Sequence, residues 1–233
     1  SMSEDGRMYV AIKTSLFLIF SLISGAATAG IIIGENKIYF SGKKEFVDVR
    51  VRNPSEKNYL LVSRIVSEES RHNIESTVQE KNFIVTPPAV SLKAGKERIL
   101  RIAKADIKSL PGNRESMHFL SVTSIPEGKT EGNSVQIAVR TWIRLIYRPE
   151  NLIKNRKLEY NLEKNGSEVK FNNKSPFYIF SSGVELNGNT VVGLKVIPPF
   201  GNAIIGECFE RCDISYELLN DDGSIGQKEK LSL

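Results

Sequence analysis

The sequence predicts an all-β protein built from two β-sandwich domains. Short extended runs separated by turn residues recur along residues 30–233, which favours sandwiches over a parallel sheet covered by helices. Long helical periodicity of apolar residues is absent from the sequence. The chain has 233 residues, 40% hydrophobic and 25% charged, a composition that suits one large or two small globular domains rather than disorder.

Residues 1–29 are typical of a secretory signal peptide. Lys13 precedes a short apolar run at 15–24, and Ala27-Thr28-Ala29 matches the small-residue cleavage pattern. The run is short for a helix that crosses a bilayer, although a retained membrane anchor is the alternative. We therefore expect export and a mature chain that begins at Gly30 and keeps the net charge of +5.

Nucleic-acid binding, metal binding and catalysis are not expected. The lysines and arginines are scattered, and no aromatic stacking pattern accompanies them. His72 and His118 are the only histidines and lie far apart, so no zinc or catalytic cluster is predicted. No P-loop and no Gly-x-Ser-x-Gly motif occurs. These observations favour a binding protein that is not an enzyme and has no cofactor.

Seven extended runs are expected in residues 30–149, enough for one sandwich. They are 31–40, 46–52, 59–66, 83–88 with a rigid kink at its two prolines, 91–104 with a turn at Gly95, 118–125 and 135–149.

The run at 135–149 is the longest alternating segment of the chain. Successive side chains of a strand point to opposite faces, so its residues divide into two sets. One face begins with the aliphatic residues Val135, Ile137 and Val139. The other face carries Arg140, Trp142, Arg144 and Arg148. A strand of this length with three arginines and a tryptophan on one face points to a function beyond packing.

A second, smaller domain is expected after a polar, basic hinge at 150–157. Its predicted strands are 158–162, 168–171, 177–186, 190–196 and 213–219, with turns at the Asn-Gly and Asp-Gly dipeptides of 165–166, 187–188 and 222–223. Export favours a disulfide between Cys208 and Cys212. Because this bridge closes a short loop, we expect it to shape that loop more than to hold the domain together.

Five segments of the chain resemble the periplasmic chaperones that assemble pili and related surface fibres with an outer-membrane usher. They are 86–88, 110–117 with Phe119 and 125–126, 147–149, 173–178, and 214–216 with 220–223. They follow the family's order at compatible spacings. The resemblance implies two immunoglobulin-like domains, 30–149 and 150–233, arranged in an L or boomerang shape around a cleft that holds one unfinished fibre subunit.

In that family, the last strand of the first domain lends alternating apolar side chains to a subunit that lacks its own final strand. The matching donor positions here are Val135, Ile137 and Val139. A subunit without its last strand exposes an apolar groove and unpaired backbone groups, which drive aggregation, and a lent strand covers both. Burial of each aliphatic side chain is worth about 1.5–3 kcal/mol.

Two basic residues in the family's cleft grip the subunit's C-terminal carboxylate, and the matching residues are Lys37 and Arg144. The two residue types are exchanged relative to the common pattern, which keeps the charge but changes the geometry of the grip. The alternative is that both are ordinary solvated strand residues. Arg144 and Val139 point to opposite faces of a regular strand, so a bulge or strong twist would be needed to bring them together.

Glu115, Arg148 and Asp221 match three charged positions that the family uses as an interdomain ion cluster, which sets the angle of the cleft. The resemblance thus implies a chaperone for fimbrial subunits that delivers them to an outer-membrane usher. It has no nucleic-acid partner, and the free protein could cap its donor strand by dimerising. A secreted β-sandwich adhesin or fibre subunit is the alternative function.

Overall fold

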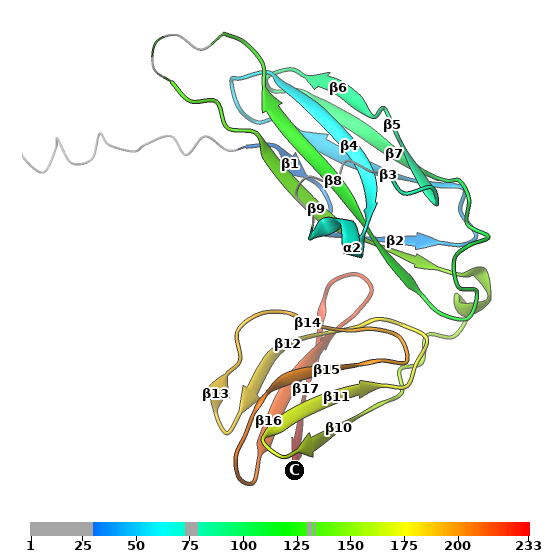
Figure 1. Ribbon diagram of the computed structural model, residues 1–233, viewed down its shortest axis with the longest axis vertical. Coiled ribbons are helices and arrows are strands. Elements are labelled where there is room, and N and C mark those ends of the chain that lie inside the picture. The colour runs from blue at the N-terminus through cyan, green and yellow to red at the C-terminus, as the bar shows by residue number, and fades with distance from the viewer. Residues whose placement is uncertain (1–29, 73–78, 130–131, 133) are drawn as a thin grey trace, which may run out of the picture. The chain divides into compact units, whose positions relative to one another are not determined.

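The computed structural model describes residues 30–72, 79–129, 132 and 134–233 (Figure 1). Regular structure in these ranges is almost wholly β, with helix α2 (Glu68–Arg71) and a 3-10 turn at Glu150–Leu152 besides the strands. The predicted all-β class is therefore confirmed. None of the helices in these ranges has the length and apolar character needed to cross a bilayer. The predicted signal peptide lies outside the described residues.

Two sheets form the first sandwich. One has the order β1 (Ile32–Ile33), β3 (Phe46–Arg52), β7 (Glu97–Lys104) and β5 (Phe83–Thr86). The other has the order β2 (Lys37–Ser41), β9 (Val139–Arg148), β8 (Ser116–Pro126), β4 (Tyr59–Ser67) and β6 (Ala89–Leu92). Alternate side chains from both sheets meet in one core, where Phe40, Leu61, Leu100 and Leu145 are fully buried. This burial of one face of each sheet is what the alternation in the sequence predicts.

The run at 31–40, predicted as one strand, forms two strands in different sheets. β1 pairs with β3, whereas β2 pairs in parallel with β9. The Gly34 amide donates to the Arg50 carbonyl at 2.9 Å before the chain leaves the first sheet. The single-strand prediction is wrong because one straight strand cannot hydrogen-bond in both layers of a sandwich. The turn predicted at Gly95 is present. Gly95, with φ of 72°, lies between β6 and β7.

Strand β9 is shorter than the predicted strand at 135–149. Its ladder with β8 runs from Ser116 opposite Tyr147 to Ser124 opposite Val139. Beyond Ser124, β8 pairs with β4 only and then ends at Pro126, which has no amide hydrogen to donate. Residues 135–138 consequently lie outside regular strand structure. The alternation was present in the sequence, but a strand also needs a neighbouring backbone to pair with.

The second sandwich is built from residues 160–232. One sheet has the order β10 (Tyr160–Asn165), β11 (Glu168–Asn173) and β15 (Asn202–Glu207). The other has the order β13 (Asn189–Thr190), β12 (Ile179–Leu186), β16 (Asp213–Leu219) and β17 (Ile225–Ser232), with β14 (Lys195–Ile197) also paired to β12. Their inward faces form a second core that includes Phe171, Ile179 and Ile205.

In this half, one strand prediction is wrong and two strands were missed. The run at 190–196 contains parts of β13 and β14 on either side of Gly193, whose φ is 99°. Strands β15 and β17 were not predicted at all. Most side chains of β17 are exposed, so this edge strand lacks the apolar alternation that marks a half-buried strand.

The strands up to β9 pair only with one another, and so do the strands from β10 onward. A third apolar cluster nevertheless draws on both sets, because Phe180 of β12 joins Val66, Met117, Phe119 and Ile146. This cluster explains why Ile146 is buried although it lies on the arginine-bearing face of β9. The domain ranges 30–149 and 150–233 stay a prediction.

Candidate functional site

The three predicted donor positions are exposed apolar side chains. Val135, Ile137 and Val139 are 84%, 69% and 54% exposed. Only Val139 belongs to β9, and the other two lie in the extension that precedes it. Exposed aliphatic side chains at alternate positions form an apolar row that the fold itself does not cover.

This row continues into an unpaired strand edge. On one side, β9 pairs with β8 from Val139 to Tyr147. On its other side, β2 pairs only with the second half of β9, from Lys37 opposite Arg144 to Ser41 opposite Arg148. In the described part of the chain, no strand pairs with that side of β9 between Val139 and Ile143. Its backbone groups are therefore available to an extended chain from another molecule.

Lys37 and Arg144 are brought together at the point where β2 begins. They are direct partners in the parallel register, so both side chains leave the same face of the sheet. Among the described residues, no carboxylate lies within ion-pair distance of either cation. The Lys37 ammonium lies 4.0 Å from the Phe180 ring centroid and 5.3 Å from that of Tyr39.

Both cations are held at an electrostatic cost. Burial lowers the pKa of Lys37, and the neighbouring charges of Arg156 and Arg144 lower it further, against an opposing effect of Asp221. Burial likewise lowers the pKa of Arg144, and the charge of Arg71 adds to the effect. An anion placed between the two side chains would relieve this cost, because opposite charge stabilises the protonated form of each.

Strand β9 has no bulge between Val139 and Arg144 that would bring their side chains to the same face. The pairing of β8 with β9 runs without a register shift from Tyr147 to Val139. Val139 and Arg144 therefore point to opposite faces of the sheet. A pocket of about 750 Å³ includes Lys37 and Asp221 in its lining but neither Arg144 nor the donor positions. The candidate site is thus a strand edge rather than a cavity.

The three residues of the predicted ion cluster lie in direct contact. The Arg148 guanidinium donates to the Glu115 carboxylate at 3.0 Å and to the two carboxylate oxygens of Asp221 at 2.8 and 3.1 Å. Glu115 also accepts the Tyr178 amide at 2.7 Å. Sequence reasoning missed a fourth member, Arg156, whose Nε lies 3.0 Å from Asp221. Nothing in the basic segment 150–157 distinguished this residue from its neighbours.

The environments of the two carboxylates differ. Burial raises the pKa of Glu115, and the charge of Arg148 and the Tyr178 amide offset the rise only in part. Burial also opposes ionisation of Asp221, but the hydrogen bond and charge of Arg148 and the charge of Arg156 outweigh it and lower the pKa. Glu115 is accordingly the member of the cluster whose charge depends most on its arginine.

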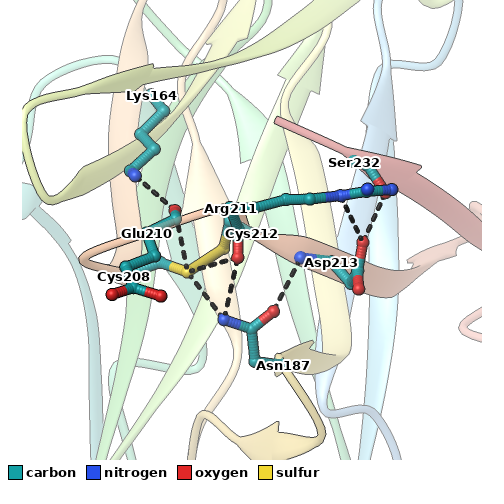
Figure 2. The surroundings of a disulfide bond; sticks show 8 residues. All are labelled: Lys164, Asn187, Cys208, Glu210, Arg211, Cys212, Asp213 and Ser232. Atoms are coloured by element: carbon teal, nitrogen blue, oxygen red, sulfur yellow. Dashed lines mark hydrogen bonds and ion pairs between the residues drawn. A yellow bond between two sulfur atoms is a disulfide. The ribbon is translucent and has the colours of Figure 1, made fainter.

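Cys208 and Cys212 form a disulfide, as predicted. Figure 2 shows Asn187 beside it, donating to the Cys208 sulfur at 3.1 Å and to the Arg211 carbonyl at 3.2 Å. The Cys212 backbone exchanges two hydrogen bonds of 2.9 Å with Leu233. The bridge therefore organises a loop and the last strand of the second sandwich. Within the described ranges, no group of three or more His, Cys, Asp or Glu residues has a geometry that could hold a metal ion.

Comparison with known proteins places this architecture in a family. Residues 30–153 match the family model for the N-terminal domain of PapD, a pili and flagellar-assembly chaperone. Residues 154–230 match the model for the C-terminal domain of the pili assembly chaperone PapD. Both halves of the described chain are thus covered.

Individual relatives agree with the two models. The chain is 30% identical to the chaperone protein FocC of Escherichia coli over 225 residues, which covers 92% of this chain and 94% of FocC. It is 28% identical to the uncharacterized fimbrial chaperone YcbF of Escherichia coli K12, with 94% and 95% of the two chains covered. Among solved structures, the periplasmic chaperone SfaE is similar, with a TM-score of 0.67, 25% identity and coverage of 86% and 98%.

Proposed function

We propose, because this chain belongs to the PapD-like family of pilus assembly chaperones, that it binds one incomplete fimbrial subunit by lending it a strand and delivers it to an outer-membrane usher. The observation that carries the proposal is the free edge of β9 between Val139 and Ile143. It is preceded by the exposed side chains of Val135 and Ile137 and ends at the neighbouring cations Lys37 and Arg144. An added strand is the partner that satisfies such an edge.

The position of β2 defines how that strand would lie. β2 runs parallel to β9 on the same side as the free edge and starts at Lys37. A subunit strand that ends with its carboxylate between Lys37 and Arg144 would therefore run parallel to β9, with its end pointing at the start of β2. The carboxylate is gripped at the edge while the donor side chains enter the subunit's groove from one face, so no bulge is required.

The ion cluster of Glu115, Arg148 and Asp221 supports the same function. Arg148 is the last residue of β9, and Asp221 lies between β16 and β17 of the second sandwich. In our proposal their contact keeps the second domain in place beside the strand that holds the subunit. The free protein would protect its exposed edge by pairing with a second copy.

In this proposal the protein works in the periplasm after removal of residues 1–29, and it carries out no catalytic step. The family membership favours this chaperone function over a secreted adhesin or fibre subunit. The location of the site agrees, because two cations on neighbouring strands suit a strand terminus, whereas an adhesin would recognise its ligand through loops.

Co-expression with a candidate pilus subunit tests the proposal. We expect gel filtration to yield a soluble 1:1 complex, because the lent strand covers the subunit's groove. Ile137→Asp should release the subunit to aggregation, and Arg144→Ala should abolish the complex. The matched controls are Val192→Asp, which makes the same change at an aliphatic side chain 88% exposed elsewhere, and Arg52→Ala on the other sheet.

Persistence of the complex in Arg144→Ala would overturn the carboxylate grip. Unchanged subunit recovery with Ile137→Asp would overturn strand donation. Loss of the complex in both control variants would show that the assay responds to any change of surface, so the two sites would have no special role.

A further inference from the structure

Phe180 is a buried aromatic residue of β12 whose ring contacts a residue of the proposed carboxylate grip. Its side chain is 1% exposed and belongs to the apolar cluster with Met117, Phe119 and Ile146 of the first sandwich. The Lys37 ammonium lies 4.0 Å from the centroid of the Phe180 ring. The second sandwich therefore supplies the surface on which a binding residue of the first sandwich rests.

The strand register places Lys37 at the end of a row of side chains on one face of the sheet. Lys37 of β2 lies opposite Arg144 of β9, and Arg144 lies opposite Phe119 of β8. Residues directly opposite each other in neighbouring strands share a face, so Arg144 has an ammonium on one side and a phenyl ring on the other. Two cations at neighbouring positions of such a row repel each other.

Repulsion from Arg144 favours a Lys37 side chain that turns away into solvent. A lysine ammonium is strongly hydrated and is carried by a flexible four-carbon stem, so it leaves a repulsive site easily. The face of an aromatic ring opposes this movement, because its quadrupole attracts a cation. Tyr39 of β2 adds a second ring, whose centroid lies 5.3 Å from the same ammonium. The Phe180 ring is the nearer of the two, and close packing in the apolar cluster holds it in place.

We propose that Phe180 is a positioning residue of the carboxylate grip, and that it holds the Lys37 ammonium beside Arg144 before a subunit binds. This inference rests on the proposed function. A side chain that is already in place loses less conformational freedom on binding, so the ring raises the affinity for a terminal carboxylate without touching it. Because Phe180 belongs to β12, the grip is complete only when the second sandwich contacts the first.

The alternative is that Phe180 only fills the apolar cluster and that the aliphatic stem of Lys37 covers its ring. Removal of the ring would then weaken the fold and the binding of a subunit to the same extent whether or not residue 37 is charged. If Phe180 acts through Lys37, removal of the ring matters only while the ammonium is present. A double-mutant cycle separates the two cases.

The test measures the dissociation constant of a fluorescent peptide that has the C-terminal sequence of a candidate pilus subunit and a free terminal carboxylate. Phe180→Leu keeps an apolar side chain and removes the ring. We expect this change to raise the dissociation constant about five- to tenfold in the otherwise wild-type protein. In a Lys37→Met background, where Arg144 still binds the carboxylate, the same change should raise it less than about twofold.

Phe171→Leu is the matched control. Phe171 is a fully buried residue of β11 in the second core, and its ring stacks on Tyr160. The control makes the same substitution away from the grip, so the dissociation constant should stay within about twofold of the wild-type value. Thermal melting compares the folding of every variant with the wild type.

A measurement on the unaltered protein covers the case in which Phe180→Leu folds poorly. In the NMR spectrum of the free chaperone, the ε-methylene protons of Lys37 should resonate upfield of those of an exposed lysine such as Lys57, because the end of the Lys37 side chain lies over an aromatic ring. Equal resonance positions for the two lysines would show that Lys37 does not rest on Phe180 in solution, and would overturn the inference.

The outcomes separate the inference from the proposed function. The C-terminal amide of the same peptide should bind the wild-type protein more weakly than the free acid, because the amide lacks the charge that the grip binds. If it does, but Phe180→Leu has the same effect in both backgrounds or none in either, the positioning role is wrong and the function stands. If the wild-type protein binds acid and amide equally, the carboxylate grip is wrong and the inference is wrong with it.

Discussion

Replacing Arg148 by methionine tests how strongly the ion cluster stabilises the fold. Methionine keeps most of the apolar stem, which matters because the Arg148 guanidinium lies 5.2 Å from the ring centroids of both Tyr39 and Phe177. What the change removes is one charge and the hydrogen bonds to Glu115 and Asp221. Glu115 is left as a buried carboxylate whose one remaining donor among the described residues is the Tyr178 amide.

The size of the effect follows from the exposure of the two carboxylates. The Glu115 side chain is 1% exposed, so water cannot replace the lost arginine. Asp221 is 38% exposed and keeps its ion pair with Arg156, so breaking its contact with Arg148 costs little stability. Removing one partner of a buried ion pair costs about 3–5 kcal/mol. Because the Tyr178 amide remains, Arg148→Met should cost about 3 kcal/mol, at the low end of that range. With a urea m-value of about 2 kcal/mol per molar, the unfolding midpoint should fall by about 1.5 M.

The stability cost of Arg148→Met should depend on pH, because it comes from the ionised form of Glu115. Burial already raises the pKa of Glu115, and without Arg148 the pKa rises further. A carboxyl whose folded-state pKa lies above its unfolded value binds more protons in the folded state, so stability falls as pH rises through that interval. The cost of Arg148→Met should therefore be smaller at about pH 5 than at about pH 7.5.

Urea unfolding followed by circular dichroism at both pH values measures this cost, and a double-mutant cycle isolates the pair. In a Glu115→Gln background no charge is left unpaired, so Arg148→Met should cost only about 1 kcal/mol. An equal cost in both backgrounds, or a cost that grows toward acid pH, would refute the argument that the ionised Glu115 is responsible.

Three further predictions concern stability and use the same unfolding assay. Arg156→Ala should cost only about 0.5–1 kcal/mol, because Asp221 is partly exposed and keeps Arg148; a cost as large as that of Arg148→Met would contradict this. Gly42→Ala should cost about 1–3 kcal/mol, since a Cβ there would lie 2.7 Å from the Glu150 backbone nitrogen, and wild-type stability would show that the backbone can move. Reduction of the Cys208–Cys212 bridge should cost about 2 kcal/mol, the value for so short a loop, and global unfolding on reduction would contradict a local role.

Side-chain periodicity and short motifs were enough to predict much of this protein. Alternation of apolar residues located most strands, because it reflects the burial of one sheet face that every sandwich requires. The resemblance led to Lys37 with Arg144, and to Glu115, Arg148 and Asp221, as groups with a shared purpose. In the fold these groups do lie together, and their roles in binding a subunit stay predictions that the experiments above test.

Strand ends, strand neighbours and the free edge were decided only by the tertiary structure. Each of these depends on hydrogen bonds to a backbone far away in the sequence, and the side chains of the strand itself do not record them. Residues 135–138 have the alternation of a strand but pair with no strand in the described part of the chain, whereas β17 pairs with β16 but has little alternation. The ion pair of Arg156 with Asp221 also depends on the fold, which brings two side chains far apart in the sequence together. The edge at Val139–Ile143 exists because β2 begins opposite Arg144 and no earlier.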